Sequence, residues 1–226
     1  MRHAIGWTAG GAAVLAAAAF PGAIGREVAR AAIERRAGVD ATRALPDGLH
    51  VALCGTGSPM PDPTRAGPCS VVIAGRHMFA LDAGEGGARN IMLMGIPNGR
   101  IEGVFLTHLH SDHIDGLGPL LLLAWTGAGR TRPLPVYGPA GTDRVVAGFN
   151  QAYAIDAGFR TAHHGASVAP PSGTGGEAMP FALPPRGDWS PVSVFEGDGL
   201  TVTAFRVDHG PVEPAVGYRF SYKGRS

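Results

Sequence analysis

The segment 108–113 constrains this chain more than any other feature, because four metal-capable side chains fall within six positions. They are His108, His110, Asp112 and His113. The run before it, 103–107, is apolar and partly β-branched, which predicts a buried strand. The residues after it, 116–119, indicate a loop that leads into a helix. The cluster therefore lies where a strand ends and a helix has not begun, a common place for functional residues in α/β folds.

The spacing of these side chains limits how they can share a cation. On an extended segment His108 and His110 point the same way, because side chains alternate between the two sides of a strand. Asp112 and His113 are adjacent, so they are better aimed at a different point unless the backbone turns between them. Imidazole and carboxylate together suit zinc, and also iron or manganese. The pattern favours two metal ions over one, and ordinary surface composition is a poor explanation for so tight a cluster.

Composition bounds the class of protein. The 226 residues are 45% hydrophobic and 16% charged, which predicts one sizeable α/β domain and argues against disorder. The net charge of +1 gives no strong nucleic-acid signal, because binding to phosphate backbones normally needs clustered Lys and Arg. Cys54 and Cys69 make no disulfide framework and no cysteine zinc site, so we expect buried free thiols. A single bridge between neighbouring strands is the alternative for an exported domain.

The N-terminal region differs from the rest of the chain. Residues 4–25 contain no Asp, Glu, Lys or Arg and follow a short basic start, so residues 1–25 predict a signal peptide or membrane anchor. A buried Ala-rich helix is the alternative. Residues 26–47 predict a helical spacer that ends in a turn, and residues 48–226 a single domain. We therefore expect a membrane-anchored or exported (periplasmic) protein, with its orientation left open.

The domain should alternate strands and helices. His77 should face solvent at the start of a strand. The long segment 165–191 is rich in Gly and Pro and predicts a lid or recognition loop. His163 and His164 have no acidic neighbour and are expected at the surface. The predicted strands are 49–53, 69–74, 77–81, 134–137, 192–196 and 200–207, and the predicted helices are 88–94, 120–129 and 142–157.

At this point the sequence resembles a known family. The pattern His-x-His-x-Asp-His after Phe-Leu-Thr is similar to the metal motif of the metallo-β-lactamase superfamily. Four further phrases resemble the branch of ribonuclease Z, the tRNA 3′-processing endonuclease, and bacterial arylsulfatase-like hydrolases. The resemblance runs from about Leu49 to the end and implies an α/β fold, an incomplete αββα sandwich preceded by an N-terminal helix. The phrases are Gly55–Pro59, Leu81–Gly86, Ser111–Leu117 and Val136–Pro139.

The resemblance implies a role for each residue of the motif. His108 and His110 would hold a first zinc ion together with His209, which precedes the Gly-Tyr-Arg strand. Asp112 and His113 would hold a second, and Asp112 would also take or orient the proton of the attacking water. The two ions would activate that water for hydrolysis.

A further carboxylate, Asp82, follows an apolar strand and therefore needs a partner. The resemblance implies that it orients the metal-binding loop through hydrogen bonds, and an ordinary helix N-cap is the alternative.

Three functions remain open at this stage. The main hypothesis is a di-zinc hydrolase of small sulfate, phosphate or related esters, with a small-molecule anionic ester as its partner. The alternative is a ribonuclease Z-like tRNA 3′ endonuclease, which is disfavoured because residues 165–191 hold one basic residue, Arg186, where a basic arm would grip tRNA. A catalytically inactive metal-binding fragment is the third.

In the resembled family the last strand continues into a loop whose Asp bridges both metals, and a further His follows. The chain ends at Ser226 before either, so we expect a form truncated at the C-terminus. We predict one tightly bound zinc ion per chain, weak binding of a second, and little activity. A calorimetric zinc titration measures the stoichiometry, and two tight equivalents per chain would contradict this prediction.

Overall fold

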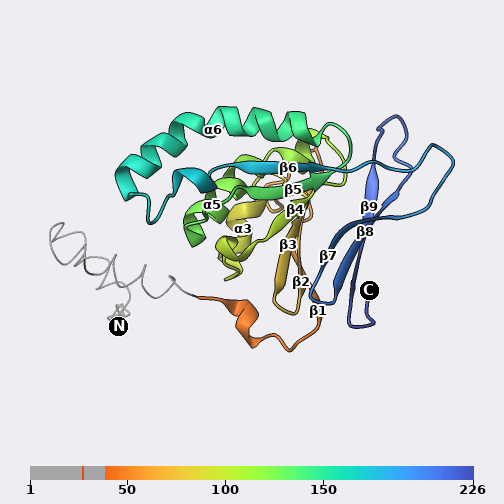
Figure 1. Ribbon diagram of the computed structural model, residues 1–226, viewed down its shortest axis with the longest axis horizontal. Helices are drawn as coiled ribbons and strands as arrows, with labels where there is room; N and C mark the ends of the chain where they lie inside the picture. Colours follow the sequence, from red (N-terminus) through yellow and green to blue (C-terminus); the bar gives the residue numbers. More distant parts are fainter. Residues whose placement is uncertain (1–26, 28–38) are drawn as a thin grey trace, which may run out of the picture. The chain divides into compact units, whose positions relative to one another are not determined.

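The computed structural model describes residue 27 and residues 39–226 of this protein (Figure 1). The predicted signal or anchor over 1–25, most of the predicted spacer over 26–47 and the predicted N-terminal helix lie outside the described residues. Within the described residues, no helix combines the length and the apolar character needed to cross a membrane. The described end of the spacer packs against the domain, because Asp47 accepts a hydrogen bond of 2.9 Å from the Tyr222 hydroxyl.

The first sheet places the predicted metal motif. Strands β1 to β3 pair antiparallel, whereas β3 to β6 are parallel, so the carboxyl ends of β3 and β4 lie at one edge. Asp82 follows β3 and the histidine motif follows β4, and the Asp82 amide donates to the Phe105 carbonyl at 2.8 Å. The strands lie in the order β1 (Leu49–Gly55), β2 (Cys69–Ala74), β3 (His77–Leu81), β4 (Gly103–Phe105), β5 (Leu134–Gly138) and β6 (Gly176–Pro180).

Three antiparallel strands form the second sheet, in the order β7 (Val192–Gly197), β8 (Leu200–Arg206) and β9 (Val216–Tyr222). The central strands of the first sheet are buried along almost their whole length, because helices cover one face and the second sheet covers the other (Figure 1). On the second-sheet side, Phe79 and Phe105 pack with Val202 and Phe220. This layering confirms the predicted α/β class.

The helices lie on the other face of the first sheet, where Ile91, Leu120 and Val146 join the core. Helix α5 begins before the predicted position 120, since Pro119 falls in its first turn, where a missing amide hydrogen costs no bond. Helix α6 extends beyond the predicted end at 157. The helical elements are η1 (Ala41–Ala44), α3 (Gly87–Leu93), η2 (Asn98–Arg100), α4 (Ser111–Ile114), α5 (Leu117–Ala128), α6 (Thr142–His164) and η3 (Pro171–Gly173).

The segment 165–191 contains a strand that local sequence did not predict. Strand β6 lies within it and pairs with β5 at the edge of the first sheet. Its glycine and proline content resembles a loop, but an edge strand tolerates Pro because one side of it needs no ladder bond. The Asn150 side chain anchors β6 through two bonds to the Gly176 backbone, at 2.8 and 2.9 Å.

His77 is buried, which contradicts the prediction that it faces solvent. Only 6% of the residue is exposed. Its Nδ1 lies 2.8 Å from a Glu102 carboxylate oxygen, and its ring packs edge-on against Phe195 of β7. The second sheet, through Phe195, covers His77. The position of this sheet over the β2–β3 hairpin cannot be deduced from the residues next to His77.

Cys54 and Cys69 form a disulfide bond, so the prediction of free thiols is wrong. The two residues lie on the neighbouring strands β1 and β2, with 5.1 Å between their Cα atoms. The structure thus agrees with the alternative given from the sequence, a single bridge between adjacent strands. The bridge closes the Pro-rich loop 56–68.

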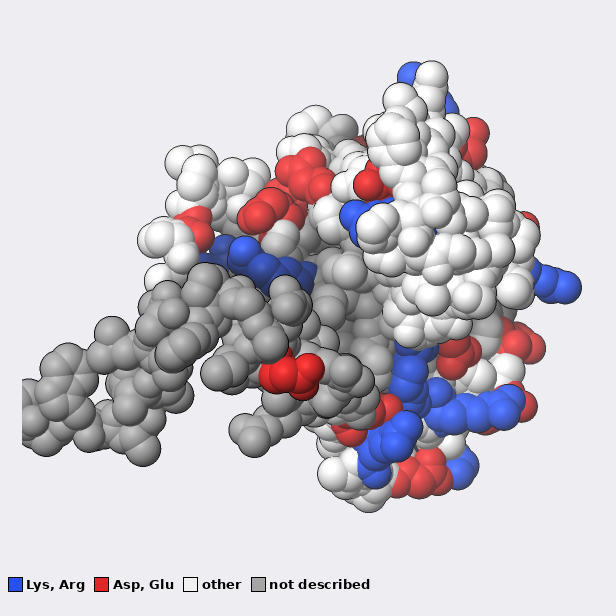
Figure 2. All heavy atoms as spheres, turned by 90° about the vertical axis from the view of Figure 1, so that its left-hand side faces the viewer, with Lys and Arg blue, Asp and Glu red and all other residues white. Residues whose placement is uncertain are grey.

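Charged side chains of both signs are interspersed on the face shown in Figure 2, which is the left-hand side of Figure 1. Among the described residues, Arg160 and Asp156 form an ion pair one turn apart on α6, at 2.7 Å. No field of one sign dominates this face, which agrees with the net charge of +1.

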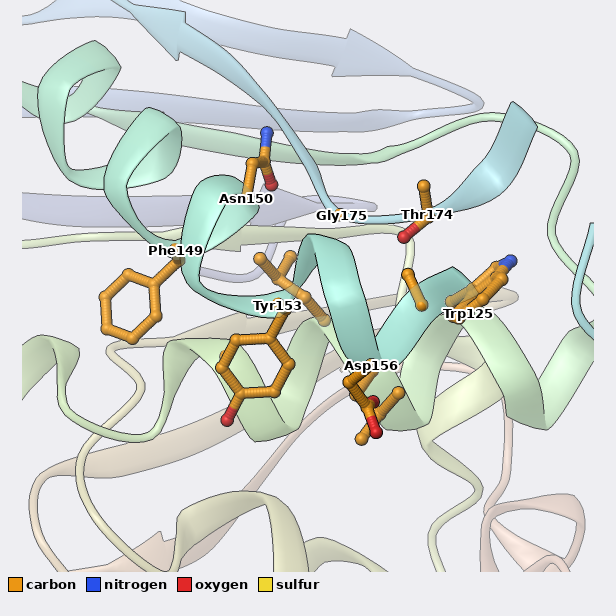
Figure 3. Close-up of a pocket in the computed structure, with 11 residues that line it drawn as sticks. Trp125, Phe149, Asn150, Tyr153, Asp156, Thr174 and Gly175 are labelled. Atoms are coloured by element: carbon orange, nitrogen blue, oxygen red, sulfur yellow. The ribbon is translucent and has the colours of Figure 1, made fainter. Parts of the chain in front are cut away.

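A pocket between α5 and α6 is lined by Trp125, Phe149, Tyr153 and other residues, none of them a predicted metal ligand (Figure 3). Tyr153 packs tightly on Gly118, where an added Cβ would lie 2.3 Å from its ring. Since Gly118 lies in the first turn of α5, shortly after the motif, this contact helps to fix the helix that follows the motif.

We predict that reducing the disulfide lowers the free energy of unfolding by about 3 kcal/mol. The reason is that the bridge closes a loop of roughly 15 residues and so removes conformational entropy from the unfolded chain. Urea unfolding with and without reductant measures the difference. Cys54→Ala, which cannot form the bridge, is the control, and reductant should leave its midpoint unchanged. Equal midpoints for the oxidised and reduced wild-type protein would contradict the prediction.

Candidate metal centre

Three predicted ligands converge from two distant segments. His108 and His110 follow β4, and His209 lies between β8 and β9. One nitrogen from each imidazole lies within 4.8 Å of the other two. The His209 ring centroid is 4.6 Å from that of His108 and 5.7 Å from that of His110. The structure therefore brings these three side chains together, whereas their role as ligands stays a prediction.

Asp82 organises the loop that carries the first two histidines. It adopts a left-handed conformation, with φ 57°, and is 6% exposed. Its carboxylate accepts hydrogen bonds from the Thr107 amide at 2.8 Å and from the Thr107 hydroxyl at 2.9 Å. It also accepts a bond of 2.8 Å from His113 Nδ1. One side chain thus holds both ends of the motif.

The hydroxyl of Thr107 links Asp82 to His108. The oxygen lies 3.0 Å from His108 Nδ1. Since the hydroxyl hydrogen is donated to Asp82, the oxygen accepts from His108 Nδ1–H, and this assignment leaves His108 Nε2 with a free lone pair. Burial, followed by repulsion from His113 and His209, lowers the pKa of His108 to about 4. The imidazole is therefore neutral near pH 7, as a metal ligand must be.

Asp112 and His113 form a second group beside the first. Because His113 Nδ1 is bound to Asp82, its other nitrogen, Nε2, faces Asp112 at 3.6 Å. Burial lowers the pKa of His113, but the hydrogen bond and charge of Asp82 outweigh it, and the pKa is raised overall. The His113 ring centroid lies 4.1 Å from that of His108, so the two groups are neighbours.

The donor set fits a borderline cation such as zinc. His108 Nε2 and His110 Nδ1 are 3.1 Å apart. Two imidazole nitrogens on one tetrahedral zinc ion lie about 3.3 Å apart, given bonds of about 2.05 Å. His108 is buried whereas His110 and His209 are exposed, so one side of the cluster is open to a substrate.

Glycine allows the loops around the motif to pack closely. At Gly84 an added Cβ would lie 2.5 Å from the Asp112 carbonyl oxygen and 2.4 Å from the Gly67 carbonyl carbon. Any larger residue would push these backbones apart. Gly84, which follows β3, is therefore required by the close approach of the loop before β2 and the loop of the motif.

A hollow of about 470 Å³ opens beside Asp112, within the range of roughly 300–1,000 Å³ that ligand sites occupy. Its charged lining consists of the carboxylates of Asp62, Glu85, Asp112 and Asp115 and the guanidinium of Arg65. This excess of negative charge attracts cations and, unless it is neutralised, repels a phosphate.

The sequence model of the metallo-β-lactamase superfamily matches residues 62–226. This chain belongs to the metallo-β-lactamase superfamily. It is 38% identical over 180 residues to ribonuclease Z of Mycobacterium bovis (strain BCG / Pasteur 1173P2), which covers 79% of this chain and 60% of that protein. The chain thus spans about 60% of the length of the curated relatives it matches.

Solved structures agree with this assignment. Human tRNase Z, short form, superposes with a TM-score of 0.55 at 25% identity, covering 77% of this chain and 65% of the human one. The metallo-β-lactamase fold protein YhfI of Bacillus subtilis gives 0.52 at 20% identity, with 78% and 58% covered, and supports the fold alone. The predicted resemblance to the superfamily and its ribonuclease Z branch is confirmed.

The comparisons also correct the sequence-based expectations. The predicted partner, a small-molecule anionic ester with no strong nucleic-acid signal, is contradicted, because the relatives are named as a ribonuclease and a tRNase. The error came from net charge, which averages over the chain and says nothing of single groups at a site. The comparisons support neither an arylsulfatase-like activity nor a signal or anchor segment.

Sequence reasoning gave no role to two residues that organise the site. Thr107 joins Asp82 to His108, and Tyr218 donates to the Leu106 carbonyl at 2.7 Å. A hydroxyl at the end of an apolar strand was the available signal for Thr107. His163 and His164 lie exposed at the end of α6, in line with the surface position expected for them.

We predict that Asp82→Asn lowers the pKa of His113 and destabilises the metal-free protein by about 1–3 kcal/mol, because a buried charged acceptor is lost. Asn tolerates a positive φ, so the backbone conformation is retained. NMR titration of the imidazoles and urea unfolding measure the two effects. Asp198→Asn, at another residue with positive φ, is the matched control. An unchanged His113 pKa would disprove the role of Asp82.

Proposed function

We propose that this protein is a metal-dependent hydrolase of the ribonuclease Z type, which cleaves RNA phosphodiester bonds at the 3′ side of tRNA precursors. One observation carries the proposal. Three imidazoles from two distant segments converge in a chain that is 38% identical to a ribonuclease Z over 180 residues. The geometry of the three imidazoles supports metal-dependent chemistry, and the names of the relatives support RNA as the class of substrate.

In this proposal His108, His110 and His209 hold a first zinc ion, and Asp112 and His113 belong to a second position. Bound zinc lowers the pKa of a water molecule and polarises a phosphoryl oxygen. The same imidazole and carboxylate set also suits iron or manganese.

The chain's own residues prepare the ligands and move the proton. Asp82 and Thr107 keep His108 in the tautomer whose Nε2 faces the cluster. The Asp112 carboxylate, which borders the hollow, is placed to accept the proton of the attacking water. Asp82 keeps His113 oriented so that its Nε2 faces Asp112.

The charges of the hollow make substrate binding depend on cations. Four carboxylates and one guanidinium line it, so a phosphodiester approaches only once positive charge has been bound there. The interspersed charges of Figure 2 offer no broad basic surface on that face. The described lining of the hollow has one basic side chain, so we expect few direct phosphate contacts within the hollow and only a weak salt dependence of binding there.

We predict that His209→Ala lowers cleavage of a precursor tRNA with a 3′ trailer by at least about 100-fold, since loss of a side chain that supports the metal costs roughly 10–100-fold in affinity even when it is not a ligand. Gel analysis of end-labelled RNA measures the rate and maps the cut. His164→Ala, at the exposed end of α6, is the control and should cleave like the wild-type protein.

Chelation of the metal should abolish cleavage, and added zinc should restore it. Two results would overturn the proposal. One is a wild-type protein that binds zinc but cleaves the precursor no faster than the zinc-free protein, since even the low activity expected of this chain requires the metal. The other is a His209→Ala variant that cleaves at the wild-type rate.

A further inference from the structure

The histidine cluster is assembled across the two sheets, so the loops that carry the histidines must be held at a defined distance from each other. His108 and His110 leave the end of β4 in the first sheet, whereas His209 leaves the end of β8 in the second. An ion that needs all three depends on how the two loops are held relative to each other. Errors of about 0.5 Å in such a constellation are enough to weaken it.

Strand β9 makes the connection between the two loops. The Val207 amide donates to the Ala215 carbonyl at 3.1 Å, which closes the His209 loop at the base of β9. From the next residue, the Val216 amide donates to the Thr107 carbonyl at 2.9 Å. The start of β9 is therefore joined both to the His209 loop and to the residue before His108.

Tyr218 provides the side-chain part of this connection. Its hydroxyl donates to the Leu106 carbonyl at 2.7 Å, two residues before His108. Its ring packs on Phe105, with 5.1 Å between centroids, and on Phe181, with 6.1 Å. Burial, and then the charge of Asp82, raise the pKa of Tyr218 well above its ordinary value, so the hydroxyl keeps its proton and remains a donor.

We propose that Tyr218 is a positioning residue for the histidine cluster, whose hydrogen bond to Leu106 sets the distance between His209 and the His108–His110 pair. The Tyr218 hydroxyl bonds to a backbone carbonyl and not to a predicted ligand, and it acts through the backbone of β9 and of the segment before His108. This inference rests on the metal centre proposed above. It adds that metal affinity is controlled by a residue of the second sheet that is not itself a ligand.

A second tyrosine on the same strand offers a matched control. Tyr222 lies at the other end of β9, and its hydroxyl donates to Asp47 at 2.9 Å. Tyr218→Phe and Tyr222→Phe each remove one hydroxyl and one hydrogen bond from β9. A merely structural role for Tyr218 predicts the same behaviour for both variants, whereas a positioning role predicts a difference in metal binding.

The experiment uses cobalt as a spectroscopic probe in the full chain. Competition with a chelator gives the affinity, visible absorption gives the coordination geometry, and thermal unfolding of the metal-free protein gives stability. Tyr218→Phe should bind cobalt about 10- to 100-fold more weakly, with an altered visible spectrum. Tyr222→Phe should keep the wild-type affinity and spectrum while losing comparable stability.

A double variant tests whether Tyr218 acts through His209. In a His209→Ala background, Tyr218→Phe should cause no further loss of affinity, because the loop that it positions no longer supplies a ligand. Wild-type affinity and spectrum in Tyr218→Phe would overturn the inference, and so would an equal loss in both tyrosine variants. A wild-type protein that fails to bind cobalt would instead overturn the metal centre itself.

Discussion

The carboxylate of Asp82 is the interaction on which the rest of the site depends. It is buried at the end of β3, beside a parallel strand whose following loop carries the histidines. A buried charge is tolerated only when its lone pairs are used, and here Thr107 and His113 use them. The need to satisfy this carboxylate fixes the backbone before His108 and the ring of His113 at once. Loop conformation and ligand orientation thus have one cause.

A second constraint comes from building the centre across two sheets. The packing of Phe79 and Phe105 against Val202 and Phe220 is non-directional and sets the separation of the sheets only coarsely. Directional bonds refine it, namely the amide of Val216 and the hydroxyl of Tyr218 on the carbonyls that precede His108. Apolar burial therefore brings the two halves together, and a small number of hydrogen bonds determine how they meet.

The sequence predicted the features that depend on neighbouring residues in the chain. Strands β2 and β3 lie at their predicted residues, and the motif follows a buried strand, as the apolar run before it predicted, although β4 ends at Phe105. The burial of His77, the pairing of β6 and the bond between the cysteines all depend on which distant strand lies alongside, and no neighbouring residue encodes that. Net charge led to the wrong partner, because a sum over the whole chain does not identify the ligand of any one site. The role of His209 was suggested by a resemblance, and only the fold places its ring beside that of His108.

The Pro-rich loop between β1 and β2 is closed by the bond between Cys54 and Cys69, and it borders the hollow beside Asp112. The part of the chain described here can therefore be cut within this loop without coming apart. A protease that cleaves near Asp62 would leave two polypeptides joined through sulfur, which migrate as one band until a thiol is added. The part of the wall that this loop forms would then end in two free chain ends attached to an intact scaffold.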